Sequence, residues 1–280
     1  MSTRFTELVG CRLPVQLAAM GGVGTTELAA SVIDAGGFGM VPNGTEPADG
    51  ACGTNFLVPF DPSFDDIGRA ARRNRVVEFF YGDPRRDVVS VAHDHGGLVG
   101  WQVGSASEAA AAERAGCDYV VAQGVEAGGH VRGRQPLDDL LAAVLTVVRI
   151  PVVAAAGIAT ASRCAEVLGL GADAARVGTR FVASPESAAH PDYVQRLCDA
   201  QNGDTVLTEW FGGGWEHAPH RVLQSAVDAA QTTGWRSAMP PYRGLDRDIS
   251  DMALYAGAGV GDVNAIEPAA DVVADFMSLL

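Results

Sequence analysis

The chain has 280 residues, of which 48% are hydrophobic, 7% are aromatic and 34 are glycine. This composition is enough for a large core and favours an α/β fold over an all-β sandwich. The net charge of −14 repels phosphate backbones, and the trio Arg72, Arg73 and Arg75 is better explained as a solvated helix end than as a nucleic-acid site. The 5 scattered cysteines include no C-x-x-C pair, and the chain shows neither an apolar run of about 18 residues nor a leader pattern, so we expect a cytoplasmic protein that uses neither membrane nor nucleic acid.

The chain opens with one βαβ unit. Residues 14–20 are predicted as the first strand, and Thr25 and Thr26 place hydroxyls at the start of the following helix. Gly36 and Gly37 end that helix before a second strand. Together with that second strand at 38–41, the remaining predicted strands lie at 54–58, 76–80, 98–103, 119–122, 152–155 and 174–177.

Helical patterns separate most of these strands. Ser105 and Glu108 form a predicted capping box, and Pro136, Pro185 and Pro268 are expected at first helical positions. Such alternation requires parallel strands with right-handed crossovers, and eight units close into a (β/α)8 TIM barrel. An open doubly wound sheet is the alternative, but no strand is followed by the G-x-G-x-x-G motif that this fold uses for dinucleotides.

The pattern loosens after Phe181. Residues 202–266 are rich in Gly, Trp, His and Pro, with one clear helix around 222–230. Two placements are open for this segment, a lid over the barrel mouth or a layer packed beneath it. No linker divides the chain, so residues 1–280 are expected to form a single domain.

Two late loops have the composition of a phosphate-binding site. The loop that contains Gly157 follows the strand at 152–155, and the loop that contains Gly178 and Thr179 follows the strand at 174–177. By the strand count these loops follow strands seven and eight, where α/β barrels usually bind phosphate. Each glycine alone is equally explained by a tight turn, but the pair favours a phosphate-bearing cofactor.

The segment 123–130 follows a strand directly and contains several glycines and one histidine. His130 can exchange a proton near neutral pH, which favours a catalytic role over a purely structural one. Glu126 is either its orienting partner or a surface residue. The amide of Gln123 binds either a ligand or the neighbouring loop.

The remaining histidines and serines do not form a recognisable metal site or hydrolase site. His93 and His95, and also His217 and His220, have no carboxylate or cysteine at metal-ligand spacing, so no metal is expected. No G-x-S-x-G turn exists, so a hydrolase triad is unsupported.

The motifs together resemble a known family, the FMN-dependent nitronate monooxygenases, formerly called 2-nitropropane dioxygenases, which are α/β barrels. The resemblance covers roughly residues 12–195, with a weaker match at 255–259 and at Pro268. The segments that carry it are 16–20, 53–56, 123–130, 156–159 and 171–181.

The resemblance implies FMN as the cofactor, a small-molecule nitronate or nitroalkane as substrate, and dioxygen as oxidant. His130 would deprotonate a nitroalkane or position a nitronate. The residues that would contact the cofactor are Ala18, Ala19, Met20, Asn55, Gln123, Gly128, Gly157, Arg176, Val177, Gly178 and Thr179, with the phosphate near Gly157 and residues 176–179.

This sequence departs from the family pattern at a few positions. Ala19 replaces a usual proline, Ala156 replaces a frequent glycine, and the stretch between Met40 and Gly53 is too short for the usual helix. Two other functions are also open: an FMN-dependent enoyl-thioester reductase that uses NAD(P)H, since such reductases share this barrel and similar motifs, and a flavin-binding protein without turnover. A homodimer is compatible with all of them.

Overall fold

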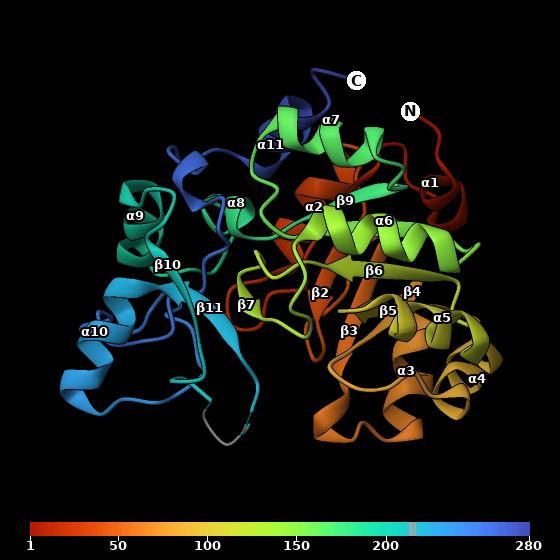
Figure 1. The fold of residues 1–280 in the computed structure, drawn as a ribbon, viewed down its shortest axis with the longest axis horizontal. Helices are drawn as coiled ribbons and strands as arrows, with labels where there is room; N and C mark the ends of the chain where they lie inside the picture. Colours follow the sequence, from red (N-terminus) through yellow and green to blue (C-terminus); the bar gives the residue numbers. More distant parts are fainter. Residues whose placement is uncertain (213–214, 216) are drawn as a thin grey trace.

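The computed structural model describes residues 1–212, 215 and 217–280, and its centre is a barrel of parallel strands (Figure 1). Within the described residues this sheet has 8 strands in the order β1-β9-β8-β6-β5-β4-β3-β2. Their bounds are β1 Val15–Leu17, β2 Gly39–Pro42, β3 Cys52–Leu57, β4 Val76–Phe80, β5 Leu98–Val103, β6 Tyr119–Gln123, β8 Val152–Ala155 and β9 Ala174–Val177. The predicted fold class is confirmed.

The barrel closes between its first two strands. The Phe38 N–H donates to the Val15 carbonyl, and the Leu17 N–H donates to the Phe38 carbonyl, both at 2.9 Å. This pairing joins the two ends of the eight-stranded sheet, so no strand edge is left open at this seam.

Helices pack outside the barrel. They are α2 Thr26–Asp34, α3 Phe64–Arg73, α4 Arg86–Asp94, α5 Ala106–Ala115, α6 Leu137–Val147, α7 Ala161–Gly169, α8 Thr179–Val182 and α11 Ala269–Phe276. As predicted, no helix lies between β2 and β3. The Ser105 side chain accepts from the Glu108 N–H at 3.2 Å, but Glu108 accepts from the Gly104 N–H, so the capping box is only half formed.

The proline expectations were partly wrong. Pro136 and Pro268 are N-cap residues, one position before their helices. Pro185 lies in a turn, and the proline at a first helical position is Pro191, which begins α9 Pro191–Asp199. Proline fixes φ equally well in a turn and in a first helical turn, so the residue type alone does not distinguish the two.

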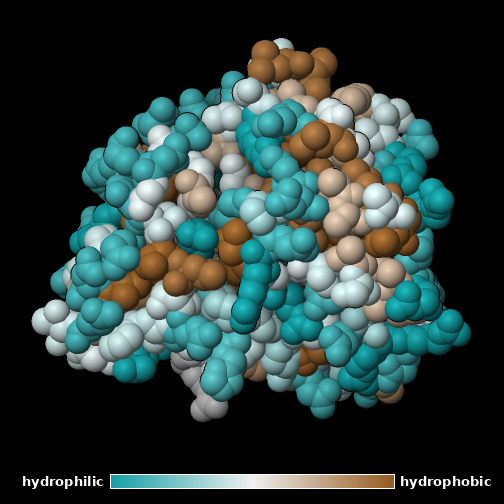
Figure 2. Space-filling view, viewed as in Figure 1, coloured by the Kyte–Doolittle hydropathy of each residue, from teal (hydrophilic) through white to brown (hydrophobic). Residues whose placement is uncertain are grey.

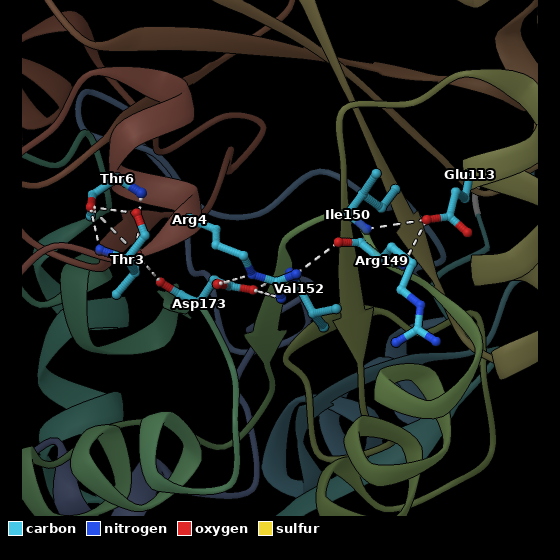
Figure 3. Close-up of polar contacts among 8 residues, drawn as sticks. All are labelled: Thr3, Arg4, Thr6, Glu113, Arg149, Ile150, Val152 and Asp173. Carbon is cyan, nitrogen blue, oxygen red and sulfur yellow. Dashed lines mark hydrogen bonds and ion pairs between the residues drawn. The ribbon is translucent and has the colours of Figure 1, made fainter.

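The N-terminal helix α1 Arg4–Val9 seals the amino end of the barrel. Phe5 is fully buried and meets the rings of Phe38 and Tyr119 edge-on. Arg4 forms a bidentate ion pair with Asp173, with nitrogen to oxygen distances of 2.9 and 2.7 Å (Figure 3). These contacts hold α1 against residues at the amino ends of β2, β6 and β9.

The C-terminal part adds a second layer beside the carboxyl ends of the strands (Figure 1). An antiparallel sheet joins β10 Thr205–Thr208, β11 His220–Leu223 and β7 Gly129–His130. The helix expected around 222–230 is α10 Gln224–Thr233, and two short 3-10 turns, η1 Val58–Phe60 and η2 Val260–Asp262, complete the elements. In this register His130 pairs with His220, so the glycine-rich loop is tied to the C-terminal segment.

Candidate active site

One large cavity lies at the carboxyl ends of the barrel strands, where α/β barrels hold their ligands. Its volume of about 990 Å³ is near the upper end of the range for ligand pockets. His130 and all but one of the residues expected to contact a cofactor line it. The lining members of that set are Ala18, Ala19, Met20, Asn55, Gln123, Gly128, Gly157, Arg176, Gly178 and Thr179.

Val177 is the residue of that set that does not line the cavity. Its side chain is buried in the hydrophobic core between strands and helices. Successive side chains on a strand point to opposite faces, so Arg176 points into the barrel and Val177 points out of it. Only the backbone of Val177 is available to a ligand.

The two predicted phosphate loops meet at one side of the cavity. The N–H groups of Gly157 and Gly178 donate no hydrogen bond to another described residue. Gly157 has a φ of +61°, and the preceding Ala156 has a φ of +138°, a conformation that normally needs glycine. The free N–H groups and this strained turn make the loops suitable for an anion.

Gly128 serves a different purpose from Gly178. A Cβ on Gly128 would lie 2.6 Å from the Gly257 nitrogen, so this glycine permits close packing of two backbone segments. A Cβ on Gly178 would meet only Ala18 Cβ at 3.4 Å and Met20 Sδ at 3.7 Å, on the cavity side. The space over Gly178 therefore belongs to the cavity.

Segment 255–259 closes this side of the site. The Gly257 N–H donates to Thr179 Oγ1 at 3.0 Å, and the Ala258 N–H donates to the Glu126 carbonyl at 2.8 Å. Tyr255, Gly257 and Gly259 line the cavity. The sequence carried a weak signal here, in the family match at 255–259, but these residues were not assigned to the site.

The amides of Gln123 and Asn55 differ in availability. Gln123 Nε2 donates to the His130 carbonyl at 2.9 Å, and its Oε1 accepts from the Arg132 N–H at 3.2 Å. The Gln123 amide was expected to bind either a ligand or the neighbouring loop, and both of its observed hydrogen bonds are to the loop. The Asn55 amide has no hydrogen bond to a described residue, which leaves it free for a ligand.

His130 lies in a ring of aromatic side chains. Its imidazole stacks on Trp215 with a centroid distance of 4.1 Å, and the rings of Tyr81, His220 and Tyr255 lie at 6.2, 5.2 and 6.0 Å. Its Nε2 is buried and has no partner among the described residues. Burial, together with the nearby His220, lowers the pKa of His130 from 6.5 to about 3, so the imidazole is neutral at physiological pH.

Glu126 is half-buried, and its observed hydrogen-bond partner is a backbone group rather than His130. Its carboxylate accepts from the Leu137 N–H at 3.2 and 3.1 Å and so caps the start of α6. It does not orient His130.

The Arg176 side chain forms its hydrogen bonds inside the barrel, below the cavity. Its Nη1 donates to Glu78 Oε1 at 2.7 Å and to Gln102 Oε1 at 2.8 Å, and its Nε donates to Gln16 Oε1 at 3.1 Å. Tyr119 adds a hydrogen bond to Glu78 at 3.0 Å. The guanidinium is thus already neutralised by a buried carboxylate.

The aromatic neighbours of His130 were missed in the sequence. Tyr81 follows β4 directly and has a φ of +67°, a strained conformation for a bulky residue that is often found at functional sites. Its position at a strand end was the available signal. Trp215 lies in a segment without periodicity, so no pattern pointed to it.

Two features are absent from residues 1–212, 215 and 217–280. These residues hold no group of three or more His, Cys, Asp or Glu side chains arranged for a metal ion. No helix among them combines the length and apolarity needed to cross a membrane.

Comparison with known proteins gives the family. Residues 67–278 match the family model for nitronate monooxygenase. A nitronate monooxygenase of Pseudomonas aeruginosa is 31% identical over 274 residues, which is 76% of this chain and 78% of that protein.

Two solved structures are similar to this chain in both fold and sequence. FabK from Thermotoga maritima has a TM-score of 0.86 at 30% identity, covering 99% of this chain and 95% of that chain. A nitroalkane oxidase from Streptomyces ansochromogenes has a TM-score of 0.77 at 30% identity, covering 98% and 96%. The chain belongs to the nitronate monooxygenase family, whose members are oxidoreductases that in general depend on a flavin.

Proposed function

We propose that the protein binds FMN in this cavity and oxidises alkyl nitronates with dioxygen. The observation that carries the proposal is the buried, unpartnered Nε2 of His130 on a side chain that lines the cavity. An unsatisfied buried polar atom costs roughly 1–3 kcal/mol, and a bound ligand that supplies the missing partner removes this cost. A nitronate carries its charge on two oxygens and can accept a hydrogen bond from the neutral imidazole.

Several residues that line the cavity support FMN binding. The free N–H groups of Gly157 and Gly178 would hold the phosphate, with Thr179 beside them. The small side chains of Ala18 and Ala19 leave room for a flat ring, and the Asn55 amide is free to bind a polar edge. When bound, FMN supplies the redox chemistry that accepts electrons from the substrate and passes them to dioxygen.

Arg176 would contribute from the floor of the cavity. Its guanidinium is paired with Glu78, so it does not compete for the phosphate as a free cation. Val177 would contribute through its backbone only.

The state of His130 favours the ionised substrate. A base removes a proton from carbon efficiently only when its pKa lies near the working pH. Burial lowers the pKa of His130 to about 3, so the imidazole is a weak base. We therefore assign it to binding and orienting a nitronate, and not to deprotonating a neutral nitroalkane.

We also propose that residues 1–280 act as one unit in which 202–266 covers the barrel mouth. Residues 213, 214 and 216 of that segment lie outside the described residues. Support comes from Trp215, Met239 and Tyr255, which line the cavity, and from the pairing of β11 with β7.

The test begins with the cofactor. The purified protein is expected to be yellow and to release FMN on denaturation, identified by chromatography. A colourless protein that FMN does not reconstitute would remove both enzymatic functions. Anaerobic mixing with an alkyl nitronate should then bleach the flavin, and admission of dioxygen should restore its colour.

An enoyl-thioester reductase is the second candidate, because the cavity is larger than a short nitronate needs. Bleaching by NADH or NADPH, without bleaching by a nitronate, would establish it. Retained flavin that neither reagent bleaches would instead indicate a binding protein without turnover. The paired state of Arg176 argues against the reductase, since the described cavity lining then offers no free cation to a phosphate-bearing carrier.

A further inference from the structure

Glu78 and Arg176 form an ion pair inside the barrel that the proposed chemistry does not use. Charged side chains normally lie in water, and hydrophilic residues dominate the face of the molecule shown in Figure 2. Glu78 is instead 0% exposed and Arg176 is 7% exposed. Apolar residues of similar volume often replace a buried ion pair without loss of stability. The stability of the fold alone therefore does not account for this pair.

The pair has a fixed orientation along the barrel. Arg176 lines the cavity, whereas Glu78 is not part of the described lining. Glu78 accepts a hydrogen bond from Tyr119, whose ring meets Phe5 of α1 at the amino end of the barrel. The positive end of the pair therefore lies on the cavity side, and the negative end lies on the amino side.

The guanidinium is held in place and offers no free N–H group to a ligand. Its five N–H groups are all used, two by Gln16, two by Glu78 and one by Gln102. Burial acts to lower the pKa of Arg176, but the charge of Glu78 outweighs this effect and the pKa is raised, so the positive charge is kept. Arg176 therefore acts on a ligand through its electric field, which a buried site screens less than water does.

This charge lies beside the surface proposed to hold the flavin ring. Gln16, which accepts from Arg176, is two residues before Ala18 in the chain. The Ala18 N–H donates to the carbonyl of Val177, the neighbour of Arg176, at 2.8 Å. Arg176 and the small residues Ala18 and Ala19 therefore share one wall of the cavity.

We propose that the buried Glu78–Arg176 pair makes a flavin bound in the cavity easier to reduce. Two electrons and one proton convert an oxidised flavin ring into an anion, and a positive charge held nearby favours that anion over the oxidised form. The charge is fixed before the cofactor binds, so no reorganisation is needed when the ring is reduced. The inference rests on the proposed function in requiring that the cavity holds FMN, and it is independent of the substrate.

The test measures the ratio of reduced to oxidised flavin at a fixed potential, set anaerobically with a reference dye. The wild-type protein should show a higher ratio than free FMN. The double variant Glu78→Gln, Arg176→Gln removes both charges, and its ratio should fall about ten-fold, which for a two-electron couple is about 30 mV. Glu78→Gln alone leaves the positive charge without its counter-ion and should raise the ratio, a change of sign that a purely structural role would not produce.

A second ion pair, outside the cavity, provides the matched control. Arg180 is 6% exposed, pairs with Glu267 and donates to the Ala265 carbonyl at 3.0 Å. Neither Arg180 nor Glu267 is part of the described cavity lining. The variant Arg180→Gln, Glu267→Gln should lower the melting temperature and leave the flavin ratio unchanged.

A further double variant guards against loss of the fold. Glu78→Leu, Arg176→Met replaces the pair by apolar side chains, which generally preserve stability, and it should lower the flavin ratio as the glutamine double variant does.

The outcomes separate this inference from the proposed function. Ratios that are the same in the wild type and in the double variants at 78 and 176 would overturn the inference, and so would a wild-type ratio at or below that of free FMN. Ratios that shift as expected in a protein that no nitronate bleaches would overturn the proposed substrate and leave the inference standing. Bleaching by a nitronate with unshifted ratios would do the reverse, and a protein that binds no FMN would overturn both.

Discussion

Two polar side chains, the buried Arg176 and the half-buried His130, line the same cavity and differ in their hydrogen bonding. The guanidinium of Arg176 is surrounded by Glu78, Gln16 and Gln102, whereas His130 Nε2 has no partner among the described residues. A buried charge whose hydrogen bonds are satisfied orders the barrel, whereas a buried polar atom without a partner is a cost that a ligand can remove. The comparison separates the part of the site that maintains the fold from the part that is available for chemistry.

Breaking the ion pair should produce the largest effect. Glu78→Gln leaves the Arg176 charge buried without its counter-ion, which typically costs about 3–5 kcal/mol. Urea denaturation at neutral pH measures the change in the free energy of unfolding. Asp66→Asn, which breaks an exposed ion pair with Arg69, is the control and should change little. Equal losses in the two variants would refute the distinction.

The opposite result is expected for His130. His130→Ala should retain the flavin and the fold but lower kcat for a nitronate by about 100-fold, since one oriented hydrogen bond to the reacting group is lost. The paired comparison is His220, whose Nε2 accepts from the Phe211 N–H and whose Nδ1 bonds the Ala218 carbonyl. His220→Ala should chiefly lower stability, measured by thermal melting. Unchanged turnover in His130→Ala would remove the catalytic role.

Substitutions of Gly128 and Gly178 should separate stability from cofactor binding in the same way, with smaller effects. Gly128→Ala forces a Cβ against the Gly257 backbone and should destabilise the protein by about 1–3 kcal/mol. Gly178 has a φ of −121°, which alanine tolerates, so Gly178→Ala should keep its melting temperature without cofactor and bind FMN more weakly. Fluorescence titration with FMN tests this, and tighter or equal FMN binding would contradict the placement of the cofactor.

The smallest effect is a dependence of stability on pH. Because the pKa of His130 is lowered from 6.5 to about 3, the folded protein binds fewer protons than the unfolded chain between these values. The stabilisation is complete above pH 6.5 and is lost as the pH falls, by about 2 kcal/mol from this group at pH 5. His130→Gln should reduce the slope in denaturation curves recorded across this range. A slope that the substitution leaves unchanged would assign it to other groups.

The sequence was most informative where a structure repeats. The strand and helix periods predicted the closed barrel, and the order of the loops placed Gly157 and Gly178 at one cavity. The sequence could not predict which side chains pair, because Glu78 and Arg176 are far apart in the chain and meet only through barrel closure. Trp215 was missed because its segment has no hydrophobic periodicity. Tyr81 was missed because its positive φ cannot be predicted from the residue type.

The pairing of β7 with β11 has a consequence for how this protein can change during evolution. His130 and His220 are register partners, so the candidate catalytic histidine is part of the same small sheet as the segment above the barrel. A chain that lost or exchanged this segment would lose the strand that pairs with the histidine. The C-terminal segment and the glycine-rich loop are therefore expected to be inherited together, and grafting either one alone onto a related barrel should not transfer activity.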